Sequence, residues 1–360
     1  MEEQEARLRG RSKREIVIEE FTPYIICVLS NVSFAGFNII SKISLDKGMS
    51  CYVLVAYGHA FATLVTAIPA FLFERNNESR ISIPVLRNIF FMGLLGGALG
   101  RTLFYLGLEN TSPIFASATA NTVPSITFIL AVLCRMERVN ISKLSAQAKI
   151  GGTIIAFAGA IVMTLFKGMA VLSTHKHSRR SASSVISSDK DWIKGCLMLF
   201  GSFVSMSSFF ILQTTTVKMY PAPLTLTSLT CLSATLLSTI MSAILDHKAA
   251  SWRLSWNITL LAPLYSGIVV FGIVLYAQTL VMRRKGPVFV TAFRPLATVV
   301  ATVMAILILG DALHLGSIMG SVLIFVGLYA ILWGKNKEME TSLSKHAISD
   351  QQVVEIKPEK

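Results

Sequence analysis

The sequence predicts an all-α polytopic membrane protein with ten transmembrane helices, arranged as two inverted repeats of five. Three observations lead to this fold class. The 360-residue chain is 53% hydrophobic and only 15% charged, against roughly 25% charged residues in an ordinary soluble domain. Ten apolar stretches are long enough to cross a bilayer, and landmarks of the first half recur in the second. A soluble fold has too little interior to bury so much apolar side chain.

Each predicted helix is a mostly apolar stretch of about 20 residues, the length that spans the hydrocarbon core. The first half holds 21–42, 51–73, 84–108, 113–134 and 148–167. The second half holds 192–214, 223–245, 259–282, 287–309 and 315–333. The predicted units are a tail (1–20), repeat one (21–167), a polar linker (168–190), repeat two (191–334) and a second tail (335–360).

The internal repeat rests on two matching segments, one in each half of the chain. Ser112-Pro113-Ile114-Phe115 in the first half corresponds to Gly286-Pro287-Val288-Phe289 in the second. A carboxylate follows each of these prolines at the same spacing, at Glu137 and at Asp311. Because five is an odd number, the second repeat enters the membrane from the opposite side. Many secondary transporters have such inverted repeats, with the substrate site near the middle of the membrane.

The distribution of Lys and Arg predicts that both termini are cytoplasmic. Cytoplasmic loops collect these residues, and most basic residues of the short loops fall on that side, although the basic linker does not. The formal net charge of +13 therefore has a membrane explanation, and we expect no nucleic-acid partner.

Two arginines inside predicted helices, Arg101 and Arg294, are the sharpest candidates for a substrate site. Arginine keeps its charge and presents a planar fork that suits a carboxylate, so the pair favours an anionic or carboxylate-bearing substrate. The alternative is that each side chain extends to the nearer membrane surface. Counted along their helices, the two arginines are expected on opposite sides of the middle of the membrane.

Neutral polar side chains within the predicted helices could orient a substrate by hydrogen bonding. Those predicted to line a central cavity with the arginines are Asn38, Tyr105, Asn121, Gln213 and Gln278. The alternative for each is a hydrogen bond between helices, which contributes about 0.6 kcal/mol in measured cases.

Three further residues have candidate conformational or proton-carrying roles. Pro124 and Pro295 each lie inside an apolar stretch, where proline frees a backbone carbonyl and creates a kink or hinge. His59 is a possible proton site, because histidine titrates near neutral pH, although a packed, hydrogen-bonded histidine is the alternative. No Asp or Glu lies deep within a predicted helix, which favours facilitated diffusion over tight proton coupling.

The sequence offers no nucleophile near a base, no phosphate-binding loop and no zinc-type spacing. We therefore expect no catalytic residues, no metal and no cofactor, and a protein that is not an enzyme.

Several motifs resemble those of one plant family. They are Gly107-Leu108-Glu109-Asn110-Thr111-Ser112-Pro113, Phe115-Ala116-Ser117-Ala118, Asn121-x-x-Pro124, Tyr220-Pro221 and Gly310-Asp311. Together they are similar to the nodulin-21-like, walls-are-thin-related proteins (UMAMITs) of the EamA-type drug/metabolite transporter superfamily, over about residues 22–334. The resemblance implies two inverted EamA repeats, residence in the plasma membrane or the vacuolar membrane, and transport of amino acids or auxin.

The preferred hypothesis is a secondary transporter, a facilitator or exporter of amino acids or a related small carboxylate such as auxin, working by alternating access. The alternatives are a nucleotide-sugar or phosphometabolite antiporter, and a membrane scaffold or receptor without transport. The implied partners are a small-molecule substrate and the lipid bilayer. Small-residue spacings such as Gly316 and Gly320 leave a homodimer open, beside packing within one bundle.

Overall fold

The structure is a computed structural model of the chain. It describes residues 13–74, 81–136, 143–165, 170–172, 189–246, 252, 258–291, 293–309, 313–316, 318–331, 333–334 and 337. Much of the predicted linker and of both tails therefore lies outside the described residues, as do Glu137 and Asp311.

The first half of the chain is helical throughout its described spans. Its elements are α2 (Lys13–Asp46), α3 (Cys51–Phe73), α4 (Ile83–Met92), η1 (Gly93–Leu99), α5 (Gly100–Glu109), α6 (Pro113–Thr119), η2 (Ala120–Thr122), α7 (Val123–Leu133) and α8 (Leu144–Leu165). The element η1 is π-helical and η2 is a 3-10 turn. Two of the predicted spans are thus each interrupted by a short stretch of different helical geometry.

The second half shows the same kind of interruption. Its elements are α10 (Asp189–Met219), α11 (Pro223–Leu245), α12 (Ile258–Tyr265), η4 (Ser266–Val274), α13 (Leu275–Lys285), α14 (Pro287–Thr291), α15 (Arg294–Met304), η5 (Ala305–Leu309) and a helix at Ile318–Ile331. Here η4 and η5 are π-helical.

Eight helical spans among the described residues are long and apolar enough to cross a membrane. They coincide with eight of the ten predicted spans, and the predicted bounds 51–73 and 223–245 are those of α3 and α11. The other two predicted spans fall on α8, with 22 residues, and on the shorter apolar helix Ile318–Ile331. The chain is therefore an all-helical, multi-pass membrane protein.

Local sequence explains where several helices begin. Ser112 lies before α6, and its side-chain oxygen accepts a hydrogen bond from the Phe115 amide at 3.2 Å. Pro113 follows in the first turn, where proline's missing amide costs nothing. In the second half, Gly286 has a φ of 84°, a value that favours glycine, and it separates α13 from α14 before Pro287. These turns are the two landmarks of the internal repeat.

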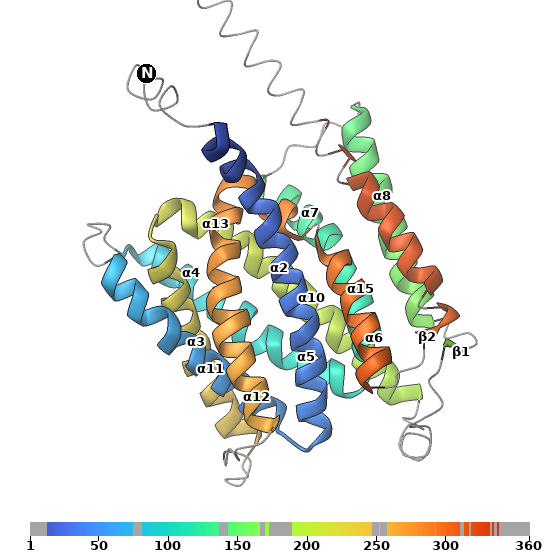
Figure 1. Cartoon of the computed structure of the whole chain (residues 1–360), viewed down its shortest axis with the longest axis horizontal. Helices are drawn as coiled ribbons and strands as arrows, with labels where there is room; N and C mark the ends of the chain where they lie inside the picture. Colours follow the sequence, from blue (N-terminus) through green and yellow to red (C-terminus); the bar gives the residue numbers. More distant parts are fainter. Residues whose placement is uncertain are drawn as a thin grey trace, which may run out of the picture.

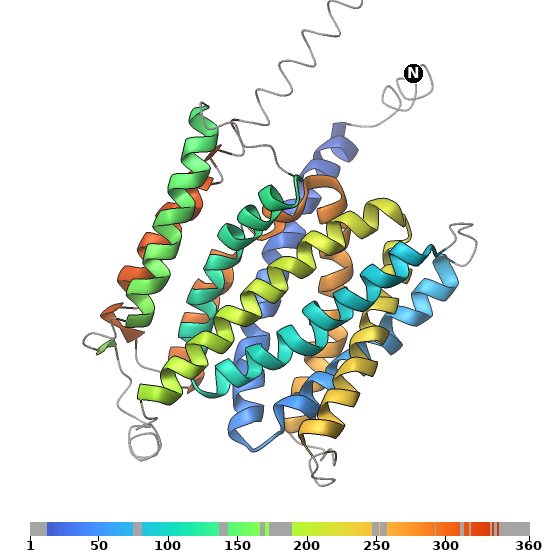
Figure 2. The same cartoon turned by 180° about the vertical axis from the view of Figure 1, so that it is seen from behind.

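Two short strands, β1 (Ala170–Leu172) and β2 (Leu313–His314), were not predicted. They pair antiparallel, with Ala170 opposite His314 and Leu172 opposite Leu313. The pairing joins the stretch after α8 to the stretch before the helix Ile318–Ile331. These two helices also lie side by side at one edge of the bundle (Figures 1 and 2), where Gly152 and Gly327 meet.

The contact between α3 and α11 is the most extensive between any two elements among the described residues. The π-helix η1 packs on α11, and η4 packs on α3. Glycines permit these approaches, because a Cβ at Gly97 would collide with that of Ala234 and a Cβ at Gly267 would lie 2.5 Å from the Gly58 carbonyl oxygen. The two halves therefore interlock through two similar π-helical contacts.

Candidate functional site

Two small cavities lie next to each other in the interior of the bundle. They share three lining residues, Phe34 of α2, Arg101 of α5 and Met206 of α10. Each measures about 20 Å³, which is room for about one water molecule. In this conformation the site is closed, and a substrate requires the surrounding helices to move apart.

The first cavity lies between the π-helices η1 and η4. Its other lining residues include Gly96 and Gly97 from η1, Val270 and Phe271 from η4, His59 from α3, Cys231 and Thr230 from α11, and Gln278 from α13. Both halves of the chain thus contribute to its wall.

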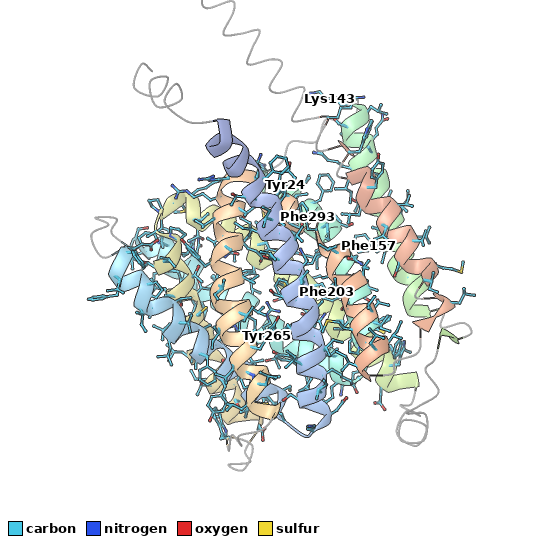
Figure 3. All side chains as sticks on the ribbon, viewed as in Figure 1. Tyr24, Lys143, Phe157, Phe203, Tyr265 and Phe293 are labelled. Carbon is cyan, nitrogen blue, oxygen red and sulfur yellow. The ribbon has the colours of Figure 1, made fainter. Side chains whose placement is uncertain are left out.

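The second cavity is more aromatic. Its other lining residues are Phe37 and Asn38 of α2, Phe104 of α5, Ser117 of α6, Ala120 of η2, Phe203 of α10, and Arg294 and Ala297 of α15. Figure 3 labels Phe203 near the middle of the bundle. The combination of phenylalanine rings with two arginines is suited to a molecule that has an apolar body and an anionic group.

Arg101 and Arg294 converge on one phenylalanine ring. The guanidinium carbon Cζ of Arg101 lies 5.8 Å from the Phe34 ring centroid, and that of Arg294 lies 4.6 Å from it. One small molecule beside this ring can therefore be reached by both guanidinium groups. Helix tilt and crossing can bring together positions that are counted from different ends of the helices, and the expectation that the two arginines lie on opposite sides of mid-membrane stays a prediction.

Burial removes the alternative that these arginines extend to a membrane surface. Arg101 is 9% exposed and Arg294 is 8% exposed. Aromatic faces provide much of their surroundings, since Arg101 Cζ also lies 4.7 Å from the Phe271 centroid. Arg294 Nη2 donates a weak hydrogen bond to the Met206 sulfur at 3.6 Å.

Neither guanidinium has a carboxylate within ion-pair distance in the described part of the chain, where Lys42 pairs with Asp46. Buried cations without a counter-ion are costly. Cation–π contacts contribute about 0.5–2 kcal/mol each, which offsets part of this cost and leaves a site that attracts an anion.

Asn38 and Asn121 belong to a chain of hydrogen bonds that joins the two halves. Asn38 Nδ2 donates to Ser117 Oγ at 2.8 Å, and Asn121 Nδ2 donates to Thr298 Oγ1 at 2.8 Å. Thr298 in turn donates to the Ser117 carbonyl at 2.8 Å. Asn38 lines the second cavity, whereas Asn121 lies behind it as part of the link between η2 and α15.

Two other predicted residues are buried but do not line either cavity. Gln213 Nε2 donates to Thr279 Oγ1 at 2.5 Å, which connects α10 to α13. Tyr105 packs its ring against Phe37 and Phe104, with centroid distances of 5.8 and 5.9 Å. Gln278, in contrast, lines the first cavity. The structure thus brings together Asn38, Arg101, Gln278, Arg294 and His59 of the predicted residues.

Pro124 and Pro295 each lie close to a change of helical geometry within a span, and their role as hinges stays a prediction. Pro124 lies in the first turn of α7, after the 3-10 turn η2, and Pro295 lies in the first turn of α15. Proline is well tolerated there, because the first helical amides have no partner within the helix. The 3-10 turn η2 comes just before α7, and α14 ends at Thr291 before α15 begins at Arg294.

Phe34 and Met206 were missed as cavity residues. They lie at similar places in the first helix of each half. Phe34 also shares one helix face with Phe37 and Asn38, through the i, i+3 and i+4 spacing. This spacing, together with the internal repeat, was the available signal. Among the described residues, no group of three or more His, Cys, Asp or Glu side chains is placed to hold a metal ion.

Comparison with known proteins agrees with this architecture. The EamA-like transporter family matches residues 21–165 and 193–333. The WAT1-related protein At5g07050 of Arabidopsis thaliana is 41% identical over 349 residues, covering 94% of this chain and 87% of the relative. The WAT1-related protein At2g40900 of the same plant is 39% identical over 328 residues, covering 91% and 82%.

A solved structure, titled only as the crystal structure of a protein, has a similar fold. Its TM-score is 0.59 at 17% identity, covering 86% of this chain and 96% of the other. At this identity the similarity concerns the fold alone.

Proposed function

The chain belongs to the EamA-like transporter family, whose members are membrane transporters rather than enzymes, and we propose that it carries small organic carboxylates. The substrates are amino acids or a related carboxylate such as auxin. The observation that carries this proposal is the convergence of Arg101 and Arg294 on Phe34, in an interior whose described residues offer them no carboxylate partner.

A carboxylate provides the charge that these arginines lack. The guanidinium fork can donate two parallel hydrogen bonds to a carboxylate, and such charge-assisted bonds are stronger than neutral ones. Asn38 and Gln278, which line the cavities, supply neutral donors and acceptors that orient the rest of the molecule. Arg101, Arg294, Asn38 and Gln278 are therefore the proposed substrate-contacting residues, with Tyr105, Asn121 and Gln213 supporting them.

The apolar lining narrows the substrate class. Phe34, Phe37, Phe104, Phe203 and Phe271 surround the arginines. Aromatic side chains favour stacked or edge contacts with another ring. Among amino acids and auxin, this lining favours carboxylates with an aromatic or large apolar body.

Transport is proposed to occur by alternating access in two inverted five-helix repeats, with both termini cytoplasmic and the protein in the plasma or vacuolar membrane. Because each cavity has room for about one water molecule, the surrounding helices are proposed to separate when a substrate enters. Pro124 and Pro295, which lie in the first turns of α7 and α15, are the proposed hinges. The lack of Asp or Glu inside the spans favours a facilitator over a proton-coupled carrier.

An antiporter of a phosphorylated metabolite is the second candidate, and one observation favours it. The two arginines that meet at Phe34 carry two positive charges, which a dianionic phosphate matches better than a single carboxylate. Obligatory exchange would distinguish the two, because an antiporter moves labelled solute only when solute is present on the opposite side.

The test is efflux of labelled amino acids, and separately of labelled indole-3-acetate, from oocytes that express the protein, with and without a pH gradient. Efflux that follows the solute gradient and ignores pH is expected. The variant Arg294→Gln should reduce it by about 30-fold or more, since losing one member of a buried charge pair costs about 2–5 kcal/mol. The exposed Arg283→Gln is the control. No efflux of either solute, with the protein at the surface, would contradict the proposal.

A further inference from the structure

The first cavity contains a histidine that the arginine site does not explain. His59 lies in the middle of α3 and is buried. Its imidazole ring stacks on the Phe271 ring, with centroids 4.3 Å apart and an angle of 11° between the planes. This parallel contact, together with the surrounding helix, fixes the orientation of the ring.

A hydrogen bond defines which nitrogen of His59 carries the proton. Nδ1 lies 2.9 Å from the Val55 carbonyl oxygen, one turn earlier in α3. A carbonyl oxygen only accepts, so the proton is on Nδ1. In the neutral imidazole the other nitrogen, Nε2, then presents a bare lone pair and acts as an acceptor.

The second nitrogen, Nε2, lies next to η1, on a residue that lines the first cavity. A Cβ at Gly97 of η1 would lie 3.3 Å from Nε2 and would also collide with the Cβ of Ala234, so only a glycine fits beside this nitrogen. The hydrogen bond that the described residues give His59 is the one at Nδ1. The charged group that faces this part of the cavity is Arg101, and Gln278 of α13 and Thr230 of α11 are its other polar neighbours.

The acceptor and the cation lie within reach of one small molecule. The His59 ring centroid and the Arg101 Cζ atom are 4.3 and 4.7 Å from the same Phe271 centroid. Both groups therefore contact one aromatic ring that lines the cavity. An aromatic acid of the size of auxin, or an amino acid, can reach both groups when it lies beside this ring.

We propose that His59 Nε2 accepts a hydrogen bond from an N–H of the transported carboxylate. The protein then selects carboxylates that also carry an amine or a ring N–H over carboxylates of the same shape that lack one. His59 acts here as a specificity-determining acceptor, and a second positive charge on it would be opposed by Arg101. The inference rests on the proposed function, because it requires that a carboxylate occupies the arginine site.

A pair of isosteres tests the inference. Purified full-length protein in proteoliposomes takes up labelled indole-3-acetate, against which two unlabelled competitors are compared. They are indole-3-acetate itself and benzofuran-3-acetate, which has oxygen in place of the ring N–H. The wild type should bind the N–H compound about 10-fold better, since a hydrogen bond contributes about 0.5–1.5 kcal/mol and an unpaired acceptor costs more. Phenylalanine and 3-phenylpropionate serve as a second pair.

Three substitutions of His59 distinguish the loss of the hydrogen-bond acceptor from the loss of side-chain packing. His59→Gln places a carbonyl oxygen near the position of Nε2 and should keep the preference for the N–H compound. His59→Asn, whose shorter side chain reaches only the position of Nδ1, and His59→Leu should reduce the preference to about one, with a larger loss of affinity for indole-3-acetate than for benzofuran-3-acetate. Thr66→Val is the control, because Thr66 is buried in the same helix and bonds to the carbonyls of Ala62 and Thr63.

The outcomes distinguish this inference from the proposed function. Equal affinity of the wild type for indole-3-acetate and benzofuran-3-acetate would overturn the inference. So would a preference for indole-3-acetate that remains in His59→Leu, or an equal loss of affinity for both compounds in His59→Asn. If transport depends on Arg294 but the protein does not distinguish the N–H compound from its counterpart without an N–H, only the inference fails. If the wild type takes up neither labelled indole-3-acetate nor phenylalanine, the proposed function fails and the inference fails with it.

Discussion

In the first half of the chain a transmembrane span changes to π-helix at η1, Gly93–Leu99, and in the second half another does so at η4, Ser266–Val274. The alignment that places Pro113 on Pro287 also places η1 on 267–273, inside η4. Both segments line the first cavity. Segments of π-helix occur frequently at functional sites. In this chain each repeat has one at the equivalent position.

The charges differ between the halves. The same alignment places Arg101 on Leu275 and Arg294 on Ala120. All four positions line a cavity, yet each pair holds one arginine and one apolar residue. We infer that the duplicated backbone geometry serves the conformational change common to both halves, whereas the unequal side chains define what is bound.

Removing the charge of one arginine is expected to have the largest effect on transport. Arg101→Gln should reduce transport by about 30-fold or more, as for Arg294→Gln, because each leaves the bound anion with half of its counter-charge. Uptake into proteoliposomes at matched protein amounts measures this. Leu275→Ala, at the equivalent position of the second half, should have a much smaller effect, and a loss as large as that of Arg101→Gln would refute the assignment of binding to the charges.

The equivalence of the two π-helices predicts matched losses of stability. Gly97→Ala pushes η1 from α11, and Gly267→Ala pushes η4 from α3, because each added Cβ collides with the facing helix. Overpacking of this kind costs about 1–3 kcal/mol, which a thermal shift in detergent would detect. Gly151→Ala, with nothing within 4 Å of the added atom, is the control. A large loss at only one of the two sites would show that the halves do not pack equivalently.

A carboxylate joins the two halves at the ends of α3 and α11. The Glu74 side chain accepts hydrogen bonds from the Leu224 amide at 3.0 Å and the Thr225 amide at 2.7 Å. These amides begin α11 and have no partner within the helix, so a negative charge there is stabilising. Glu74→Gln should therefore lower the free energy of unfolding by about 1 kcal/mol. The exposed Glu109→Gln is the matched control, and equal thermal shifts for both variants would exclude the capping role.

The smallest expected effect concerns the amide–threonine bonds. Gln213→Leu removes the bond to Thr279 within the second half, at a cost of about 0.6 kcal/mol. Its effect on transport should be smaller than that of either arginine, because Gln213 does not line a cavity. A loss of transport comparable to that of Arg294→Gln, at normal expression, would instead return Gln213 to the substrate site.

The sequence predicts where the membrane spans begin and end better than it predicts the helical geometry within them. The bounds of α3 and α11 follow from apolar runs that start after Ser50 and at Pro223 and end at Glu74 and Asp246. The π-helical segments were not predictable in this way, because they depend on packing between helices at Gly97 and Gly267 rather than on composition.

The site shows the same limit. Their charge and their position inside predicted spans identified Arg101 and Arg294 as candidates, but position along a helix does not give the distance between side chains on different helices. Their meeting at Phe34 depends on how the helices tilt and cross. The apolar members of the site, Phe34 and Met206, have the same composition signal as any lipid-facing residue, so only the spacing of Phe34 from Phe37 and Asn38 and the internal repeat were available to identify them.

The central claim is that the paired arginines form an anion site, and a binding measurement tests it most directly. Protein in lipid nanodiscs is equilibrated with labelled indole-3-acetate or phenylalanine, whichever is transported, and the bound label is displaced by the unlabelled acid or by its neutral alcohol analogue. The prediction is that the acid displaces the label about 10-fold or more better than the alcohol in the wild type, since a hydrogen bond to a charged group contributes about 1.5–3 kcal/mol. This preference should disappear in Arg294→Gln. Equal displacement by acid and alcohol in the wild type, or an unchanged preference in the variant, would contradict the claim.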